Sequence, residues 1–375
     1  MRIAVNTRLL LKGRMDGIGW FTAETMRRIV VSHPEHTFYF LFDRKPADEF
    51  IYGANVVPVV LCPQARHPIL WHMFFEWAVP WALKHYRIDL YVSPDGYMPL
   101  HPTVPTLTVI HDLNFEHATD NLKPSHQHYM TRRFPQFARA ATRVATVSEY
   151  SKKDIVETYG IDSMKVDVVY DGANPLYRPH SDEEKAAVRL RFTGGNPYII
   201  FVSTILKRKN LANLLLAFDN VKDIESSNLK LVVVGGRVWW QDELSAAYDN
   251  MRHRDDVILI GRAEPEDLSS LMSAAEALVY PSYFEGFGIP ILEAMYAETA
   301  VICSNTTSMP EVGGDAVLYI DPTSTDDIAH AVRMLNDGET RQSLITKGRV
   351  QRERYSWDNT ANLLWTSMMA TIEPQ

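Results

Sequence analysis

The stretch at residues 277–294 constrains this chain more than any other. Ala277–Tyr280 is a short apolar run that predicts a buried strand, and Glu285-Gly-Phe-Gly-Ile-Pro-Ile-Leu-Glu293 follows closely. In one continuous helix, Glu285 and Glu293 would lie on the same face, because they are eight positions apart. The glycines and Pro290 between them disfavour such a helix. Because proline is favoured at the first helical position, we expect Glu285 in a glycine-rich loop and a helix that starts near Pro290, with Glu293 in its first turn.

A strand, a glycine-rich loop and a helix N-terminus form an arrangement that binds phosphate, because free N–H groups and the helix dipole attract anions. Glu293 would repel a phosphate, so its carboxylate is better suited to sugar hydroxyls such as a ribose diol. Glu285 is placed to bind a second sugar. The structural alternative is that Glu293 only complements the helix dipole and that Glu285 is solvated, since such glycine loops are common.

The whole segment is more specific than its glycines alone. It resembles the E-x7-E signature of retaining, nucleotide-sugar-dependent glycosyltransferases of the GT-B fold, in particular family 4 with its mannosyltransferase-like group 1 members. The resemblance implies that Glu285 orients the transferred sugar and that Glu293 holds the ribose of the donor. The loop residues that it places against the donor nucleotide-sugar are Gly286, Phe287 and Gly288.

A basic turn follows the apolar run at residues 198–202, which predicts a central parallel strand covered on both faces. Cations at the carboxyl end of a strand suit a diphosphate, and the resemblance implies that Lys209 contacts the donor pyrophosphate. Family members often carry an arginine where this chain has Thr204, and we expect Arg208 to compensate. Arg262 resembles the position whose backbone reads the nucleobase. The alternative for the basic turn is a solvated surface.

The first half of the chain holds another glycine loop and a histidine at a strand end. Gly17 and Gly19 follow a predicted strand at Arg2–Asn6, and the resemblance implies that they face the donor pyrophosphate; many members have a further glycine where this chain has Asp16. The loop is not G-x-G-x-x-G, which leaves a dinucleotide dehydrogenase as a weak alternative. His111 ends another predicted strand, and the resemblance implies a place for it at the catalytic centre, in contact with the donor sugar.

Strands alternate with helices in both halves of the chain, which predicts an α/β protein with two doubly wound, Rossmann-like domains facing a cleft. The resemblance implies that this is the GT-B architecture. Proline, glycine and acidic residues give residues 174–196 the composition of a linker. We predict one domain at residues 1–178 and another at residues 179–355. The resemblance implies that the first is the acceptor side and that the second binds the nucleotide-sugar. The resemblance implies that the last helix, within residues 356–375, crosses back onto the first domain.

Charge and cysteine content exclude several classes of protein. The 375 residues carry 38 Lys and Arg against 46 Asp and Glu, a net charge of −8 that argues against a nucleic-acid binder. The first 180 residues hold 20 basic and 18 acidic residues, so the remainder holds 18 basic and 28 acidic residues. This difference in charge indicates different partners for the two halves. Cys62 and Cys303 suggest no disulfide framework, which fits a cytoplasmic protein. We find no signal peptide and no apolar run long enough to span a membrane.

Residues 68–85 contain aromatic side chains at roughly helical spacing, interrupted by Pro80. The expected structure is a helix packed on the sheet, because such stripes usually belong to a core. The alternative is a membrane-surface or lipid-acceptor helix, favoured by the abundance of tryptophan. The basic residues at 123–143 predict a solvated helical face or a surface for an anionic acceptor. These alternatives allow peripheral contact of the N-terminal domain with the inner membrane face.

The resemblance implies an activity, which is transfer of a hexosyl unit such as mannosyl from a GDP- or UDP-sugar to a glycan or lipid-linked acceptor in cell-surface polysaccharide synthesis. The expected catalytic set is His111, Lys209 and Glu285. Amides and Lys209 would stabilise the leaving diphosphate. The resemblance implies that the acceptor arrives on the face from which the diphosphate leaves, so that no protein nucleophile is required. No Asp-x-Asp pair occurs, and we expect no metal and no other cofactor. A GT-B-like sugar-nucleotide epimerase and a non-catalytic sugar-nucleotide-binding protein are the alternatives.

Overall fold

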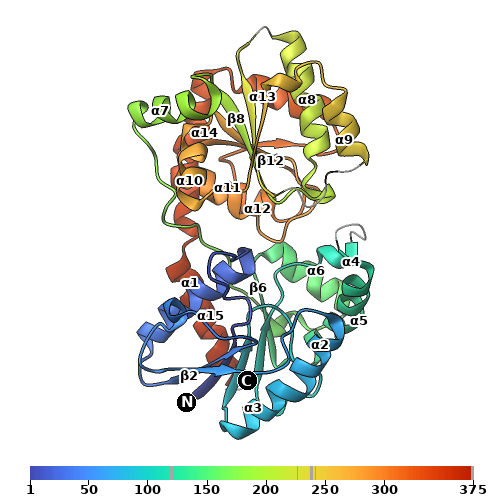
Figure 1. Ribbon diagram of the computed structural model, residues 1–375, viewed down its shortest axis with the longest axis vertical. Coiled ribbons are helices and arrows are strands. Elements are labelled where there is room, and N and C mark those ends of the chain that lie inside the picture. Colours follow the sequence, from blue (N-terminus) through green and yellow to red (C-terminus); the bar gives the residue numbers. More distant parts are fainter. Residues whose placement is uncertain (118–121, 226, 237–239, 241, 373–375) are drawn as a thin grey trace. The chain divides into compact units, whose positions relative to one another are not determined.

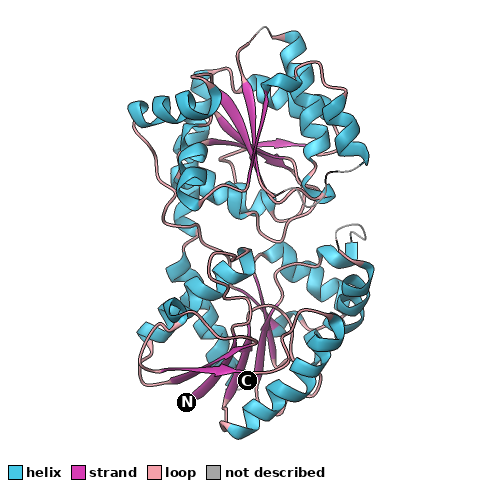
Figure 2. Cartoon of the chain, in the orientation of Figure 1, coloured by secondary structure: helices cyan, strands magenta, loops and turns pink. Residues whose placement is uncertain are grey.

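The computed structural model describes residues 1–117, 122–225, 227–236, 240 and 242–372. The chain divides into two compact units. The first comprises Met1–Asp171 and the C-terminal stretch from Trp357, and the second comprises Gly172–Ser356. Each unit holds one parallel β-sheet with helices on both faces (Figures 1 and 2). The α/β class predicted from the alternation of strands and helices is therefore confirmed.

The sheet of the first unit has seven strands in the order β3-β2-β1-β4-β5-β6-β7, all parallel. The strands are β1 Arg2–Asn6, β2 Thr37–Phe42, β3 Val56–Val60, β4 Leu90–Ser93, β5 Thr106–Val109, β6 Arg143–Thr146 and β7 Val166–Val168. Central strands are covered on both faces, which explains continuous apolar runs such as Ile3-Ala-Val5. The strand order reverses between β1 and β4, and ligands of open α/β sheets bind beyond the carboxyl ends of the strands at such a switch point.

The helices of the first unit have ends that follow local sequence rules. They are α1 Gly17–Ser32, η1 Asp48–Phe50, α2 Pro68–Met73, η2 Phe74–Ala78, α3 Val79–His85, α4 Asn114–His117, α5 Pro124–Ala140, α6 Glu149–Tyr159, η4 Ser163–Lys165 and α15 Trp357–Ile372. Ser148 caps α6 by accepting from the Ser151 N–H at 3.0 Å, and Gly160 ends it with a φ of 59°. In the described part of the chain, no helix is long and apolar enough to cross a lipid bilayer.

The segments α2, η2 and α3 form one helical run with a π turn in its middle. The Val79 N–H bonds to the carbonyl of Phe74, five residues earlier. Pro80 follows directly, and because its ring would clash with the carbonyl four residues earlier, a wider turn fits there. The predicted core helix is confirmed for Trp71, which is 7% exposed, but it is wrong for Trp77, which is 63% exposed on the outer face.

The sheet of the second unit has six parallel strands in the order β10-β9-β8-β11-β12-β13, the Rossmann order. The strands are β8 Tyr198–Val202, β9 Lys230–Val234, β10 Val257–Gly261, β11 Ala277–Tyr280, β12 Ala300–Ser304 and β13 Leu318–Ile320. The helices are α7 Asp182–Thr193, η5 Lys207–Lys209, α8 Leu211–Ile224, α9 Asp242–Asp249, η6 Arg254–Asp256, α10 Pro265–Ala274, α11 Ile289–Tyr296, α12 Met309–Gly313, α13 Thr325–Met334, α14 Gly338–Gln351 and η7 Arg352–Arg354. The switch point of this sheet lies between β8 and β11.

The last helix, α15, packs against α1 in the first unit, as Figure 1 shows in red and blue. The Arg28 Nε donates to the Asp358 carboxylate at 2.5 Å. The Trp365 ring stacks on His33, with ring centroids 3.7 Å apart. The predicted return of the C-terminal helix to the first domain is therefore confirmed.

Candidate functional site

A compact cluster of charged side chains lies at the switch point of the second sheet. Lys209 ends the turn η5 after β8, and Glu285 lies in the loop after the neighbouring strand β11. Both side chains project from the same edge of the sheet, and the Nζ of Lys209 is 2.5 Å from the Oε1 of Glu285. The same Nζ donates to the Tyr280 hydroxyl at 2.8 Å. Only 7% of Lys209 and 6% of Glu285 are exposed, so water screens this pair weakly.

Arg208 adds a second cation to the cluster. Its Nη1 lies 3.1 Å from the Oε2 of Glu285 and donates to the Phe284 carbonyl at 2.8 Å. Burial alone would raise the pKa of Glu285, but the nearby Lys209 and Arg208 lower it to about 2. Glu285 is therefore ionised at neutral pH, and the two cations leave the cluster with a net positive charge. A buried cationic group of this kind suits an anion with several oxygens, such as a diphosphate.

The loop that carries Glu285 is held by residues of the segment before α12. The Ser308 hydroxyl donates to the carbonyls of Glu285 and Phe287 at 3.0 and 2.9 Å. The Glu285 N–H donates to the Thr307 hydroxyl at 3.2 Å. Gly288 ends the loop with a φ of 102°, a conformation that favours glycine, and caps α11. These contacts fix the direction in which the Glu285 carboxylate points.

Glu293 has a different set of partners. Helix α11 begins at Ile289, because the left-handed Gly288 lets the chain turn into the helix before Pro290. Glu293 is therefore the fifth helical residue and opens the second turn, which corrects the prediction that it lies in the first. Burial raises the pKa of Glu293, and a hydrogen bond from the Tyr177 hydroxyl offsets this only in part, leaving the pKa at about 7.

The other residues predicted to bind the donor lie in varied surroundings. Thr204 is exposed just after β8, and Arg262 is exposed after β10, the edge strand two places away in the sheet. Phe287 is buried, and its ring meets Tyr355 edge-on with centroids 5.4 Å apart. Gly286 lies beside it in the same loop. The structure thus gathers the two cations with Glu285, whereas Phe287 contributes to the packing that supports the loop.

His111 follows β5 at the carboxyl edge of the first sheet. Its Nε2 lies 2.8 Å from the carbonyl oxygen of Pro94, and its ring meets Phe21 edge-on at 4.9 Å. A carbonyl oxygen only accepts, so Nε2 carries the proton and Nδ1 is the acceptor of the neutral ring. Burial lowers the pKa of His111 despite the bond to Pro94, which keeps the ring neutral at neutral pH.

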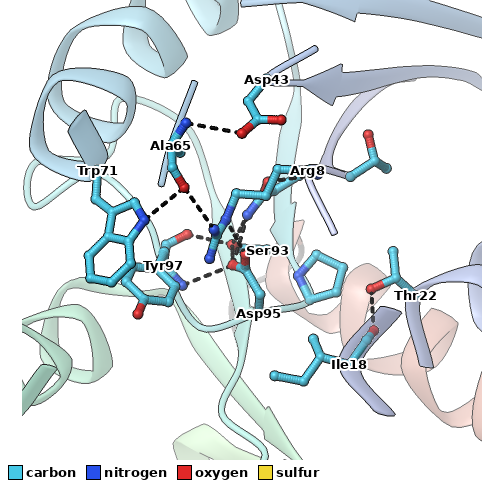
Figure 3. A network of polar contacts seen from close by, with 12 residues as sticks. Arg8, Ile18, Thr22, Asp43, Ala65, Trp71, Ser93, Asp95 and Tyr97 are labelled. Carbon is cyan, nitrogen blue, oxygen red and sulfur yellow. Dashed lines mark hydrogen bonds and ion pairs between the residues drawn. The ribbon is translucent and has the colours of Figure 1, made fainter. Parts of the chain in front are cut away.

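A buried ion pair at the switch point of the first sheet, between Arg8 and Asp95, was not predicted from the sequence (Figure 3). The Arg8 Nε lies 2.6 Å from one Asp95 oxygen, and the Asn6 amide donates to the other at 2.7 Å. The guanidinium also lies over the Tyr97 ring, 4.8 Å from its centroid. Burial lowers the pKa of Arg8, but the charge of Asp95, its hydrogen bond to Arg8 and the other neighbouring acidic groups together raise the pKa above its ordinary value, so the guanidinium stays charged. The sequence held one indication of this pair, because Arg8 and Asp95 each lie two residues after the end of a strand, β1 and β4.

Gly17 and Gly19 belong to the first turn of α1 rather than to a loop, which corrects the sequence prediction. The physical reason is Asp16, whose carboxylate accepts from the Gly19 N–H at 2.9 Å and lets the helix begin early. A Cβ on Gly19 would lie 3.0 Å from the Leu9 carbonyl oxygen, so the preceding loop packs closely there. The resemblance implies that this end of α1 faces the donor pyrophosphate. The Asp16 carboxylate adds a negative charge at the same end.

Two family models match successive parts of the chain. The model described as Glycosyltransferase Family 4 matches residues 15–175, and that described as Glycosyl transferases group 1 matches residues 182–351. The chain belongs to the family 4, group 1 glycosyltransferases. This glycosyltransferase is 28% identical to the O-antigen chain mannosyltransferase B of Escherichia coli, over 93% of this chain and 94% of the relative. It is 26% identical to the O-antigen chain mannosyltransferase RfbU of Salmonella typhimurium, over 84% of each chain.

Solved glycosyltransferase structures have the same fold. The sucrose-phosphate synthase of Thermosynechococcus elongatus has a TM-score of 0.78 at 17% identity, over 98% of this chain and 99% of that one. WaaG, a glycosyltransferase involved in lipopolysaccharide biosynthesis, has a TM-score of 0.75 at 16% identity, with the same coverage. Anabaena HepE in complex with UDP-glucose has a TM-score of 0.73 at 16% identity, over 99% and 100%. The predicted GT-B fold with two Rossmann-like sheets is therefore confirmed.

Proposed function

We propose that this glycosyltransferase moves a hexosyl unit, mannosyl in the first instance, from a sugar nucleotide to a glycan or lipid-linked acceptor in cell-surface polysaccharide synthesis. The observation that carries the proposal is the buried cluster of Arg208, Lys209 and Glu285 at the switch point of the second sheet. The names of the two bacterial O-antigen mannosyltransferases support the sugar and the pathway class. The UDP-glucose complex of HepE supports a sugar-nucleotide donor.

The cluster supports this chemistry because the leaving group is anionic. When the bond between the sugar and the phosphate breaks, negative charge grows on the departing diphosphate. Lys209 supplies a compact charge and Arg208 a planar fork of donors, both away from bulk water, where such charges act most strongly. Removing one preorganised group of this kind typically costs about 3 kcal/mol of barrier, roughly a hundredfold in rate.

The remaining predicted residues take complementary roles in the proposal. Glu293 holds the ribose hydroxyls, and Glu285 holds the two cations in place while it orients the transferred sugar. His111 takes part as a neutral ring whose Nδ1 accepts a hydrogen bond from a sugar hydroxyl without adding charge. Gly17 and Gly19 face the diphosphate through the N-terminus of α1.

We propose a retaining and metal-independent reaction. The acceptor hydroxyl forms the new glycosidic bond on the face from which the diphosphate departs, and the departing phosphate takes the hydroxyl proton. No protein nucleophile is used. The charges of Arg208 and Lys209, together with the lack of any Asp-x-Asp pair in the chain, support a diphosphate neutralised by side chains alone.

Transfer is tested by supplying GDP-mannose, UDP-glucose and related donors with a glycan acceptor and following the anomeric proton of the product by NMR. The proposal predicts an α-linked product from an α-linked donor and the same rate in excess EDTA. A β-linked product would contradict retention, and turnover lost in EDTA and restored by Mn²⁺ would contradict metal independence. Interconversion of the donor sugar without any acceptor would identify an epimerase instead.

Two variants separate the roles of the glutamates. Glu293→Ala is expected to weaken nucleotide binding with little change in kcat, because the ribose contact is made equally in the ground and transition states. Glu285→Ala is expected to lower kcat by about a hundredfold and to change nucleotide affinity less. Calorimetry measures the nucleotide affinity of both variants, and steady-state kinetics measure their kcat. Equal effects of the two substitutions on affinity and on rate would remove the assigned roles.

We propose, in addition, that the enzyme works at a membrane surface, where a lipid-linked acceptor would be held, and that the contact is made by the first unit. Support comes from large apolar side chains that this unit leaves in solvent, above all Trp77 and Trp81.

A further inference from the structure

The helical run α2–η2–α3 of the first unit has an apolar outer face. Ile69 is 65% exposed, Trp77 is 63% exposed and Trp81 is 56% exposed. On the inner face, Trp71 is buried and its Nε1 donates to the Ala65 carbonyl at 2.8 Å (Figure 3). One side of the run therefore completes the core, and the other presents tryptophan to the surroundings. Figure 1 shows α2 and α3 along the outside of the first unit.

The outer tryptophans form part of an apolar groove, which we call the Trp77 groove. Its volume is about 460 Å³. The residues that define it are Val60, Leu61, Cys62, Pro63, Met73, Trp77, Ala78 and Trp81. One wall comes from the helical run and the other from the end of β3, where Val60 is 50% exposed. Proteins rarely leave so many large apolar side chains together in water unless the surface binds something.

Exposed basic residues lie close in sequence to the residues that line the Trp77 groove. Arg66 is exposed before α2, and Lys84 and Arg87 are exposed at and just after the end of α3. The acidic residue of the run is Glu76, and its carboxylate accepts from the Leu100 N–H at 3.1 Å, so it is engaged within the unit. Lys84 lies three residues after Trp81 on α3 and hence on the same face of the helix, so at least one cation adjoins the apolar lining.

We propose that the Trp77 groove docks the first unit on an anionic phospholipid bilayer, with Trp77 and Trp81 in the interfacial layer and the flanking cations against lipid phosphates. Tryptophan favours this layer because its ring is apolar and its N–H is polar. Basic residues beside an inserted apolar face add attraction to anionic lipids. A symmetric contact with a second copy of this chain is less suitable, because it would bring like charges together.

The proposal rests on the proposed function, in that a bilayer at this surface would bring the enzyme to a membrane-held acceptor. The surface itself is made of exposed side chains remote in sequence from Lys209 and Glu285. Membrane docking and sugar transfer can therefore be measured separately on the same full-length protein.

Co-sedimentation with phosphatidylcholine vesicles, with and without phosphatidylglycerol, tests the docking. The wild-type protein is expected to bind the anionic vesicles, and the double variant Trp77→Ser/Trp81→Ser is expected to bind them at least about tenfold more weakly. Leu190→Ser is the matched control, because Leu190 is 70% exposed on α7 and lies in the second unit, so this variant should bind as the wild type does. All three proteins should melt at similar temperatures, because the substituted side chains are exposed.

A second pair of variants tests the charge. Lys84→Glu is expected to weaken binding to anionic vesicles, whereas Lys153→Glu, at an exposed position of α6, is expected to leave it unchanged. Absence of binding by the wild-type protein, or equal binding by the double tryptophan variant, would overturn the proposal. A dimer in light scattering that the double variant abolishes would assign the groove to a second copy and would overturn it too.

Turnover with a water-soluble acceptor is measured on the same proteins and is expected to be the same in the wild type and the double tryptophan variant. Loss of that turnover in the double variant alone would contradict a surface that acts only in docking. Absence of turnover from every protein, with vesicle binding and its tryptophan dependence intact, would refute the proposed function and support the docking surface.

Discussion

Glu285 and Glu293 have the same side chain and opposite ionisation behaviour, because their neighbours differ. Lys209 and Arg208 hold the pKa of Glu285 at about 2, so it is a permanent anion that organises two cations. Glu293 is half-buried beside the uncharged Tyr177, and its pKa of about 7 leaves it partly protonated at neutral pH. A carboxyl group in that state can accept from one ribose hydroxyl or donate to another.

Tyr177→Phe is predicted to raise the pKa of Glu293, because the lost hydroxyl favours the ionised carboxylate. If ionised Glu293 binds the ribose, the variant reaches wild-type affinity only at higher pH. One hydrogen bond contributes about 1 kcal/mol, so the midpoint should move up by roughly 0.7 pH units. Calorimetric titration with a nucleoside diphosphate at a series of pH values measures the shift. A uniform loss of affinity at every pH would show that Tyr177 does not position Glu293 in its ionised form.

Some residues of the site are predictable from the sequence and others are not, for a physical reason. Lys209 and Glu285 each follow a buried strand and belong to specific motifs, so their place at one sheet edge follows from local pattern. The pairing of Arg8 with Asp95 requires β1 to lie beside β4, and strand order is set by tertiary packing. The contact between Tyr177 and Glu293 joins distant segments and has no local signal either.

At the scale of elements, the start of α1 shows how a cap changes an anion site. Glycines alone predicted a loop, but an aspartate just before a helix is also a start signal, and here Asp16 fills that role. Its carboxylate occupies the positive end of the helix dipole. The helix N-terminus is therefore partly neutralised before any diphosphate arrives.

Asp16→Asn tests whether this charge matters for the donor. Asparagine caps helices about as well as aspartate, so the free energy of unfolding should change by less than about 0.5 kcal/mol. If Gly17 and Gly19 face the diphosphate, removal of the negative charge should lower the KM for the donor by a few fold, or about 0.3–1 kcal/mol. Steady-state kinetics measure the KM for the donor, and thermal unfolding measures the change in stability. An unchanged KM would place the diphosphate away from α1.

The turn between the Glu285 loop and α11 depends on one glycine. A Cβ on Gly288 would be only 3.2 Å from the Ile291 side chain, and the φ of 102° is unfavourable for other residues. Gly288→Ala is therefore expected to lower the free energy of unfolding by about 1–2 kcal/mol and to reduce kcat. Gly338→Ala is the control, because Gly338 begins α14 and a Cβ there meets nothing within 4 Å. Thermal unfolding compares them, and equal melting temperatures would contradict the requirement for glycine at 288.

At the scale of the whole molecule, each unit places its polar residues at the switch point of its own sheet. Arg8 and Asp95 meet there in the first unit, and Lys209 and Glu285 meet there in the second. Alternating strands and helices predicted both sheets, since parallel strands covered on both faces need continuous apolar runs. The order of the strands within each sheet could not be predicted in this way, because it depends on contacts between distant segments.

The C-terminal helix is part of the first unit although it follows the second in the sequence. Its residues Leu364 and Met368 are fully buried, and β4, β5 and β6 are in contact with the same helix. This apolar face explains why α15 packs where it does, because it would otherwise be exposed to water. The family resemblance predicted the crossover, whereas the helical pattern alone predicted only the helix.

The central claim is that the buried cations of the second unit bind the diphosphate of a sugar nucleotide. Calorimetry of the full-length protein with GDP, UDP and ADP tests it, with Lys209→Ala compared to Lys207→Ala in the same turn, where Lys207 is exposed and Lys209 is buried. We predict that one of these nucleotides binds, that Lys207→Ala has nearly wild-type affinity, and that Lys209→Ala binds at least about tenfold more weakly. Equal affinity of the two variants, or no binding of any nucleoside diphosphate to the wild-type protein, would contradict the account.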